Sequence, residues 1–298
     1  MGLIVITPNM TNITIRSKLP KIKNAKEIHQ ENNLPIKNLK DPAMSLETIL
    51  VPCYTDNYAV LLHDDKTNKT ICIDAPEARP ILSALSERSW SLDTLLITHH
   101  HKDHIAGIDQ IKEITGAKTY GPEAEKLQIP NLDELVKEGT ALTWSGREVD
   151  ILETPGHTLG HVCYHFKEEN IIFTGDTLFA LGCGRLFEGT PAQMWNSLSK
   201  LMILPKKTKV YCGHEYTLSN AEFACKYEPN KIDLQTRIIE IRAARSKNQP
   251  TIPTTIEKEL LTNPFLRASS PELRENLNLA NATDEEVFTE IRNRKNNE

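Results

Sequence analysis

The stretch LLITHHHKDH at residues 95–104 decides how this sequence is interpreted, because an apolar run leads directly into four histidines and an aspartate. The apolar residues predict a strand that carries the polar ones to its carboxyl end. Because alternate residues of an extended segment share a face, we expect His99, His101 and Asp103 on one side. A helix that opens directly afterwards is expected to turn His104 towards the same place.

Three further segments have the same design, in which a strand is followed by glycine and then by a side chain that can bind metal. They are ILETPG at 151–156 before His157, IIFTG at 171–175 before Asp176, and VYCG at 210–213 before His214. Glycine permits a sharp exit from a strand and a close approach of the backbone. We therefore expect all of these side chains at one edge of a sheet.

Imidazole and carboxylate donors together suit zinc, iron or manganese, and seven such donors are too many for one tetrahedral ion. We therefore predict two divalent metal ions per chain, with zinc as the expected identity and iron or manganese as alternatives. One ion is assigned to His99, His101 and His157, the other to Asp103, His104 and His214, and Asp176 is assigned to bridge them.

A water between two such ions can lose a proton near neutrality, because one bound zinc ion already lowers the pKa of water from about 15.7 to about 7. The predicted nucleophile is a hydroxide that bridges the two ions. Asp103 and Asp176 are therefore the candidate catalytic residues as well as ligands. His100 is expected to point away from them, and Asp74 and His161 are candidates for orienting a ligand through a hydrogen bond.

The pattern of apolar residues divides the chain into three parts. Residues 1–43 form an extension rich in Asn and Lys, residues 44–216 mix strands with helices, and residues 217–298 are expected to be helical. Strands are predicted over 48–51, 58–63, 70–74, 94–98, 148–153, 162–166, 171–174 and 209–212. Helices are predicted over 77–87, 105–115, 192–201, 218–227, 232–245, 255–261, 271–279 and 283–294. This order predicts an α+β fold with mixed sheets.

Composition excludes several classes of protein. The 298 residues are 39% hydrophobic and 25% charged, which is ordinary globular usage. We find no apolar run of the roughly 18 residues that a membrane span needs. The formal charge of −5 offers no broad cationic face, so nucleic acid is not the expected partner. We expect a monomer that binds neither nucleic acid nor membranes.

Cysteine usage and the first segment bear on location. The six cysteines form no C-x-x-C pair, which is typical of reduced thiols in the cytoplasm. Residues 1–43 contain no acidic residue before Glu27, a property shared with transit peptides, which would place the protein in mitochondria. The same segment is also consistent with a tail, or with a natural start at Met44.

The motifs quoted above, THHHKDH at 98–104, PGHT at 155–158, FTGDT at 173–177 and GHEYT at 213–217, resemble those of the metallo-β-lactamase superfamily. Within it, the chain is similar to the glyoxalase II (hydroxyacylglutathione hydrolase) family from about residue 46 to its end. The more specific motifs are TDNY at 55–58, GCGRLFEGT at 182–190 and NPFLR at 263–267. The resemblance implies an αββα sandwich as the catalytic domain, a dinuclear metal site, and a C-terminal helical domain that helps to bind glutathione.

The resemblance also implies substrate-binding residues, while the seven ligands match the family's pattern without a gap. Arg185 stands where many members have lysine, which keeps a cation but changes its geometry. Phe187 replaces a different residue and offers only its ring and backbone. Tyr216 matches a tyrosine that follows the last ligand. Arg292 and Lys295 are similar to an R-x-x-K pair that holds the glycine carboxylate, or else they form a solvated basic helix end.

The implied reaction is hydrolysis of the thioester S-D-lactoylglutathione to glutathione and D-lactate, in the detoxification of methylglyoxal. A thioester suits this site, because the leaving thiolate has a conjugate acid of pKa about 8.5 and needs no dedicated general acid. The chain contains neither G-x-S-x-G nor G-x-x-x-x-G-K-[ST], which argues against a serine hydrolase and a P-loop enzyme.

Four alternatives remain open at this point. A metallo-β-lactamase normally has cysteine where Asp176 stands, which counts against it. A persulfide dioxygenase with one iron can keep the same ligands, although the helical tail with NPFLR favours the hydrolase. An RNA-processing nuclease should carry an added domain and a basic surface. A metal-binding protein without catalytic activity is disfavoured by the intact ligands.

Overall fold

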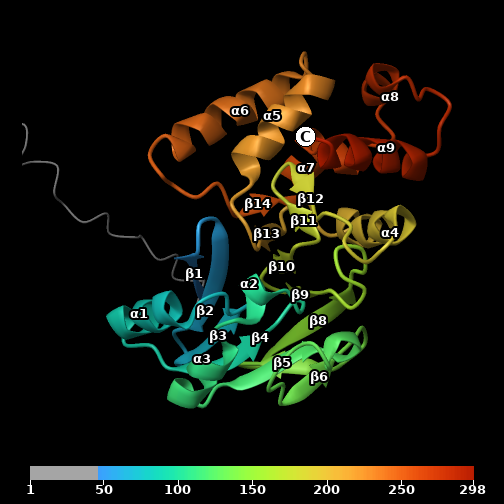
Figure 1. The fold of residues 1–298 in the computed structure, drawn as a ribbon. Helices are drawn as coiled ribbons and strands as arrows, with labels where there is room; N and C mark the ends of the chain where they lie inside the picture. Colours follow the sequence, from blue (N-terminus) through green and yellow to red (C-terminus); the bar gives the residue numbers. More distant parts are fainter. Residues whose placement is uncertain (1–45) are drawn as a thin grey trace, which may run out of the picture. The chain divides into compact units, whose positions relative to one another are not determined.

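The computed structural model describes residues 46–298, in which two six-stranded sheets are stacked (Figure 1). The predicted extension over 1–43 lies outside the described residues. The first sheet has the order β1 (Leu46–Cys53), β2 (Asn57–Asp64), β3 (Lys69–Ile73), β4 (Leu92–Leu96), β5 (Lys118–Pro122) and β6 (Glu134–Val136). Its first three strands are antiparallel, and β3 to β6 run parallel.

The second sheet has the order β14 (Thr254–Thr255), β13 (Lys209–Cys212), β10 (Ile171–Gly175), β9 (Val162–Phe166), β8 (Arg147–Glu153) and β7 (Leu142–Trp144). Its strands are antiparallel except for the parallel pair β10 and β13. Two short strands, β11 (Leu178–Phe179) and β12 (Gly182–Cys183), form a separate hairpin. Both sheets are therefore mixed, as predicted.

Successive residues of the central strands are buried on opposite faces, and this explains the layers. In β4, Leu95 packs towards the helices outside the first sheet, whereas Leu96 packs towards the second sheet. In β10, Ile172 faces the helices outside the second sheet, whereas Phe173 faces the first. Strands that are apolar on both faces must be covered on both. The predicted αββα sandwich is confirmed.

Helices cover both outer faces of the sandwich. The first sheet is covered by α1 (Ala78–Arg88) and α3 (Ile108–Thr115), and the second by α4 (Pro191–Met202) and part of the C-terminal region. The C-terminal helices, grouped in orange and red in Figure 1, are α5 (Thr217–Tyr227), α6 (Ile232–Arg245), α7 (Ile256–Thr262), α8 (Pro271–Leu277) and α9 (Asp284–Asn296). Ile172 and Val210 of the sheet share a core with Phe265 and Phe288, so the described residues form one compact unit.

The helix predicted over 105–115 is wrong in its extent, because the chain forms two helices there, α2 (Lys102–Ile105) and α3. The backbone N–H of Ala75 donates to the carbonyl of His104 at 2.8 Å, and the N–H of Gly107 donates to the carbonyl of Ala75 at 2.8 Å. Backbone groups that would have continued the first helix are therefore bonded to Ala75. The break leaves α2 as a single turn that carries Asp103 and His104.

Several short strands were not predicted, namely β5, β6, β7, β11, β12 and β14. The expectation that strands end at Tyr216 is wrong, because β14 pairs Thr254 with Val210 and Thr255 with Lys209. Segments of two to five residues carry too little periodic pattern of their own, and they become strands because a partner strand offers unpaired backbone groups.

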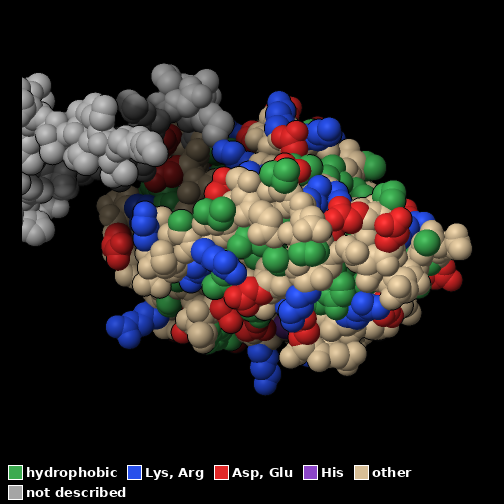
Figure 2. All heavy atoms as spheres, turned by 90° about the horizontal axis from the view of Figure 1, so that it is seen from above, with side chains coloured by type: hydrophobic (Ala, Val, Ile, Leu, Met, Phe, Trp, Pro, Cys, Tyr) green, Lys and Arg blue, Asp and Glu red, His purple; other side chains and the backbone are tan. Residues whose placement is uncertain are grey.

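Charged side chains are dispersed over the surface in view. On the face shown in Figure 2, Lys and Arg alternate with Asp and Glu and with apolar patches, and neither charge forms a continuous field. The extended positive surface that phosphate backbones require is not visible on this face. Among residues 46–298, no helix is both long and apolar enough to cross a membrane.

The shared core predicts that the helical region and the sandwich unfold together. Phe265, which is 1% exposed, stacks with Phe223 at a ring distance of 5.8 Å. We expect Phe265→Ala to lower the free energy of unfolding by about 3–5 kcal/mol, because it leaves a large cavity. Urea unfolding should show one transition in both proteins. Leu127→Ala, at a site that is 92% exposed, is the control and should change the free energy of unfolding by less than about 0.5 kcal/mol. Two separate transitions would contradict the shared core.

Candidate metal centre

The seven predicted ligands lie in the segments that follow four strands. His99, His101, Asp103 and His104 follow β4, His157 follows β8, Asp176 follows β10 and His214 follows β13. The backbone N–H of Gly213 donates to the carbonyl of Gly175 at 3.0 Å, which joins the ends of the two parallel strands. The expectation that all these side chains lie at one edge of a single sheet is wrong, because β4 belongs to the first sheet, whereas β8, β10 and β13 belong to the second. The donors of the two stacked sheets nevertheless come together in the same groups.

Asp103 lies at the centre, but the expectation that it shares an extended segment with His99 and His101 is wrong. Strand β4 ends at Leu96, and Asp103 lies on α2 rather than in an extended segment with His99 and His101. Helical geometry therefore separates Asp103 from the two preceding histidines and groups it with His104 and His214.

One group of donor atoms comprises three imidazoles. Nδ1 of His101 lies 3.1 Å from Nε2 of His99 and 2.9 Å from Nε2 of His157. Tetrahedral zinc at about 2.1 Å from each nitrogen separates neighbouring nitrogens by roughly 3.4 Å. The three ring nitrogens are thus gathered at a spacing close to that of ligands around one ion.

The second group combines two imidazoles with a carboxylate. Nε2 of His214 lies 3.2 Å from Nε2 of His104 and 3.4 Å from Oδ2 of Asp103. Nε2 of His104 lies 3.8 Å from the same carboxylate oxygen. Asn57 supports the carboxylate, because its amide donates to Oδ2 of Asp103 at 3.0 Å. This group therefore offers two nitrogen donors and one carboxylate donor.

Asp176 lies between the two groups. Its Oδ2 is 3.3 Å from Nε2 of His157 and 3.4 Å from Nε2 of His214, while its Oδ1 is 3.4 Å from Nε2 of His104. Oδ1 is buried and has no hydrogen-bond partner. A buried carboxylate oxygen without a partner is costly unless a cation compensates it. The donor set therefore fits a pair of metal ions that share Asp176.

The pKa values of the histidines differ between the two donor groups, being raised for His104 in the second group and lowered for His101 in the first. Burial would raise the pKa of Asp176, but His104 and His214 outweigh it and hold that pKa well below its usual range. Burial opposes protonation of His104, yet Asp176 and Asp74 raise the pKa of its imidazole to about 9. Burial and His157 lower the pKa of His101 to about 4. The second group is thus the more strongly negative environment.

Hydrogen bonds from Nδ1 fix the ring orientation of three ligands. In the neutral imidazole, a proton on the donating Nδ1 leaves Nε2 without one and directed at the centre, which is the tautomer that binds metal. The pairs are His104 with Asp74 (2.8 Å), His214 with Asp56 (2.9 Å) and His157 with the carbonyl of Arg185 (2.8 Å). The expectation for Asp74 agrees with this contact.

Sequence reasoning missed the roles of Asp56 and Asn57. Both belong to the TDNY motif at 55–58, in which Asp56 lies in the turn after β1 and Asn57 is the first residue of β2, and Asn57 forms an isolated bridge with His214. No periodicity in the sequence indicates that the TDNY motif reaches the centre. His161 acts on the backbone instead, since its Nε2 accepts from the N–H of Asp176 at 3.0 Å.

Two glycines allow this density of side chains. A Cβ added at Gly213 would lie 2.6 Å from Cε1 of His104 and 2.7 Å from Oδ1 of Asp176. Gly175 has a φ of +45°, and its Cβ would lie 2.7 Å from Nε2 of His161. Contacts this short do not occur, so each position needs a residue without a side chain.

His100 points away from the centre, as predicted. Its Nδ1 lies 3.0 Å from a carboxylate oxygen of Glu125, and its Nε2 lies 3.3 Å from one of Glu188. Glu125 also accepts from the N–H of Gly160 at 3.0 Å, and Glu188 accepts from the N–H of Leu159 at 2.8 Å. The imidazole therefore links the segment after His157 to the segment after Arg185.

A cavity of about 410 Å³ opens onto the two groups. Its lining includes three of the predicted substrate-binding residues, Arg185, Phe187 and Tyr216. The ring of Phe187 is 62% exposed and lies 5.5 Å from that of His101 and 5.3 Å from that of His157. The ring of Tyr216 stacks on His214 at 4.6 Å. A cation, a phenol and an exposed aromatic ring therefore surround the centre.

Arg292 and Lys295 do not line this cavity. The guanidinium of Arg292 is buried, donates to the carbonyl of Cys183 at 2.9 Å and lies 5.0 Å from the ring centre of Phe265. The ammonium of Lys295 lies 3.3 Å from Oγ of Ser219. Arg292 is thus bonded to the end of β12 and Lys295 to a residue of α5, so the pair does not form a freely solvated helix end.

Comparison with known proteins gives two family matches. The model described as "Metallo-beta-lactamase superfamily" matches residues 70–214, and that described as "Hydroxyacylglutathione hydrolase C-terminus" matches residues 215–298. A hydroxyacylglutathione hydrolase of Rhizobium meliloti is 52% identical over 85% of this chain and 99% of its own length. One of Cereibacter sphaeroides is 48% identical over 85% of this chain and 100% of its own length.

A solved structure supports the fold alone. The crystal structure of TTHA1623 in a di-iron-bound form is 22% identical and covers 74% of this chain and 100% of that chain, with a TM-score of 0.55.

The hydrogen bond from His104 predicts a role for Asp74 in metal affinity. Asp74→Asn removes the negative charge while keeping the shape, so His104 is held less firmly. We expect about 10- to 100-fold weaker binding at the second group, measured by titration of the metal-free protein with zinc. Asp150→Asn is the matched control, because Asp150 pairs with His165 at 3.7 Å, outside the centre. Equal affinities in the three proteins would remove Asp74 from the site.

Proposed function

Because the chain belongs to the hydroxyacylglutathione hydrolase family within the metallo-β-lactamase superfamily, we propose that it hydrolyses S-D-lactoylglutathione to glutathione and D-lactate. The observation that carries the proposal is the position of Asp176. Its carboxylate joins two groups of metal donors directly beneath a cavity that also contains a cation and a phenol. This arrangement suits the attack of water on an acyl group held above it.

Two divalent ions are proposed as cofactors, held by the residues of the two groups with Asp176 between them. Zinc is the expected identity, and iron or manganese would be accepted by the same nitrogen and oxygen donors. When bound, such a pair activates water and polarises an acyl oxygen. The protein's own contribution is to hold the donors in place before binding, through the hydrogen bonds of Asp74, Asp56 and the carbonyl of Arg185.

The leaving group explains why no separate acid is required. Asp103 and Asp176 are the carboxyl groups that line the cavity, and the pKa of each is lowered. Both therefore remain ionised near neutrality and cannot readily donate a proton. A thiolate whose conjugate acid has a pKa of about 8.5 leaves without one, whereas the amine of a cleaved lactam would not. The site is thus better suited to thioesters than to amides.

Arg185 and Tyr216 are the proposed contacts for glutathione at the cavity wall. The exposed guanidinium of Arg185 can pair with one of the two carboxylates of glutathione, and Phe187 offers an apolar ring beside the centre. The prediction that Arg292 and Lys295 hold the glycine carboxylate stays a prediction. For that role, the guanidinium of Arg292 would have to exchange its bond to Cys183 for one to substrate.

The proposed setting is the cytoplasm, with the enzyme as a monomer. The described residues include six cysteines, all free and five of them buried, which is consistent with a reducing compartment. A transit peptide in residues 1–43, and with it a mitochondrial location, is a prediction that falls outside the described residues.

The proposal predicts both metal content and substrate. The purified protein should contain about two metal ions per chain by elemental analysis. It should consume lactoylglutathione, which is measured as a decrease in thioester absorbance. A chelator should abolish this activity. Added zinc should restore it. Metal-loaded protein that leaves the thioester intact but opens a lactam or a lactone would contradict the proposal.

Substitutions should separate turnover from substrate binding. Asp176→Asn and His104→Ala are expected to lower kcat by at least about 10³-fold, because both disrupt the metal groups. Arg185→Ala should mainly raise KM, by about 5- to 20-fold, because a remote ionic contact contributes uniform binding. Arg185→Lys retains the cation and should recover most of the affinity. An unchanged KM in Arg185→Ala would remove its side chain from the substrate site.

A further inference from the structure

Asp176 and Arg185 are connected by the hairpin of β11 and β12, so its position affects both ends. Each strand has only two residues, and a hairpin of this size is not stable by itself. Leu181, at its turn, has a φ of +59°, which is unfavourable for a residue with a branched side chain. The hairpin therefore needs support from its surroundings.

The support comes from side chains of the helical region that bond to the hairpin backbone. The amide of Asn263, the first residue of the NPFLR motif, donates to the carbonyls of Phe179 at 3.3 Å and Gly182 at 3.0 Å. Glu259, one turn earlier, accepts from the N–H of Leu181 at 2.8 Å. Both side chains are fully buried.

Two more helices complete this support. On α5, the amide of Asn220 donates to the carbonyl of Ala180 at 3.1 Å. On α9, Arg292 donates to the carbonyl of Cys183 at 2.9 Å. Five consecutive residues, 179–183, are thus each bonded to a side chain of the helical region.

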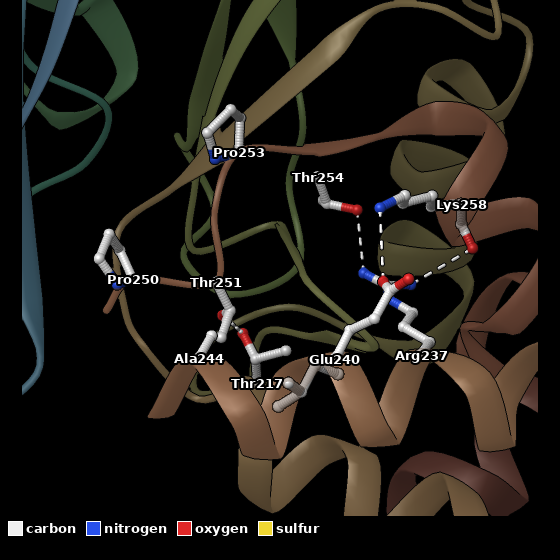
Figure 3. Close-up of a pocket in the computed structure, with 10 residues that line it drawn as sticks. Thr217, Arg237, Glu240, Ala244, Pro250, Thr251, Pro253, Thr254 and Lys258 are labelled. Atoms are coloured by element: carbon white, nitrogen blue, oxygen red, sulfur yellow. Dashed lines mark hydrogen bonds and ion pairs between the residues drawn. The ribbon is translucent and has the colours of Figure 1, made fainter. Parts of the chain in front are cut away.

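Glu259 and Asn263 are themselves held in one conformation. The second carboxylate oxygen of Glu259 pairs with the buried guanidinium of Arg237 and accepts from the hydroxyl of Thr254 at 2.6 Å. Figure 3 shows Arg237 between Thr254 and the backbone of Lys258, below a small cavity that is lined by α6 and the segment 250–254. Asn263 bonds to Glu259 at 2.9 Å, so the two act together.

We propose that Glu259 and Asn263, assisted by Asn220 and Arg292, are positioning residues for the metal centre. They hold the hairpin so that Asp176 keeps its place between the donor groups and Arg185 keeps its place at the cavity. This proposal rests on the roles proposed above for Asp176 and Arg185. It gives the NPFLR motif a physical role, and it assigns the helical region a part in metal binding as well as in covering substrate.

The test uses substitutions that remove hairpin contacts and spare the helices. Asn263→Ser keeps an oxygen that can accept from the N–H of Phe265, as Oδ1 of Asn263 does at 3.0 Å, but cannot reach the hairpin. Asn220→Ala removes one contact and favours the helix that contains it. The control is Thr255→Ala, which removes the N-cap of α7, where Oγ1 accepts from Lys258 at 3.2 Å, without a hairpin contact.

The measurements are hydrogen exchange of the backbone amides in 177–184 and the rate at which zinc-loaded protein releases metal to a chelator. We expect Asn263→Ser to accelerate exchange in this segment by at least about tenfold, with unchanged exchange in β3 and β4. Metal release should accelerate by about tenfold or more, and Asn220→Ala should show smaller changes in the same direction. With lactoylglutathione, kcat should fall more than KM rises.

Thr255→Ala should match the unsubstituted protein in both measurements, even though it is less stable. The proposal is wrong if the Asn263→Ser and Asn220→Ala proteins show the same hairpin amide exchange and the same rate of zinc release as the unsubstituted protein. It is also wrong if Thr255→Ala accelerates both processes as much as these two substitutions do. Asn220→Ala decides the matter if Asn263→Ser does not fold. Because both measurements are made without substrate, they keep their meaning if the thioester is not the substrate.

Discussion

The buried carboxylate of Asp176 is the constraint on which the rest of the site depends. A carboxylate in the interior is costly unless cations or hydrogen-bond donors compensate it, and imidazoles from three different strand ends lie within 3.4 Å of its oxygens here. Those strand ends must therefore meet at one edge, which the stacked sheets achieve. Two glycines then remove the side chains that would keep the donors apart. The buried negative charge of Asp176 is also what attracts metal cations to this site.

Much of this could be predicted from residues alone, and the reason is the strength of the pattern. An apolar run before a donor indicates that the donor lies at the end of a strand. It also indicates that the strand is buried, as for Leu95 and Leu96 before His99. The break between α2 and α3 could not be predicted, because it depends on the backbone of Ala75, far away in sequence. The short strand β14 depends in the same way on the edge of β13.

The partners of the ligands were harder to predict than the ligands. Asp74 lies at the end of a predicted strand, whereas Asp56 lies in a turn and Asn57 at the first residue of the strand after it, where no periodic signal indicates a role. Basic residues were the least predictable, because Arg292 contacts a carbonyl that only the folded chain brings near it. A motif can thus identify a residue without stating which of its groups acts. The helical region illustrates this, since the buried side-chain amides of Asn220 and Asn263 contact the backbone of the β11–β12 hairpin and not the cavity.

Position 185 performs two tasks with two different parts of one residue. Its carbonyl orients His157, and its side chain lies at the cavity wall. Every amino acid supplies the same carbonyl, so the side chain here can be exchanged during evolution without loss of the metal. Substrate preference can therefore drift, or be redesigned, at a residue directly bonded to a ligand. Such separation of backbone and side-chain duties lets the residue at the cavity wall change while the orientation of the metal ligand stays the same.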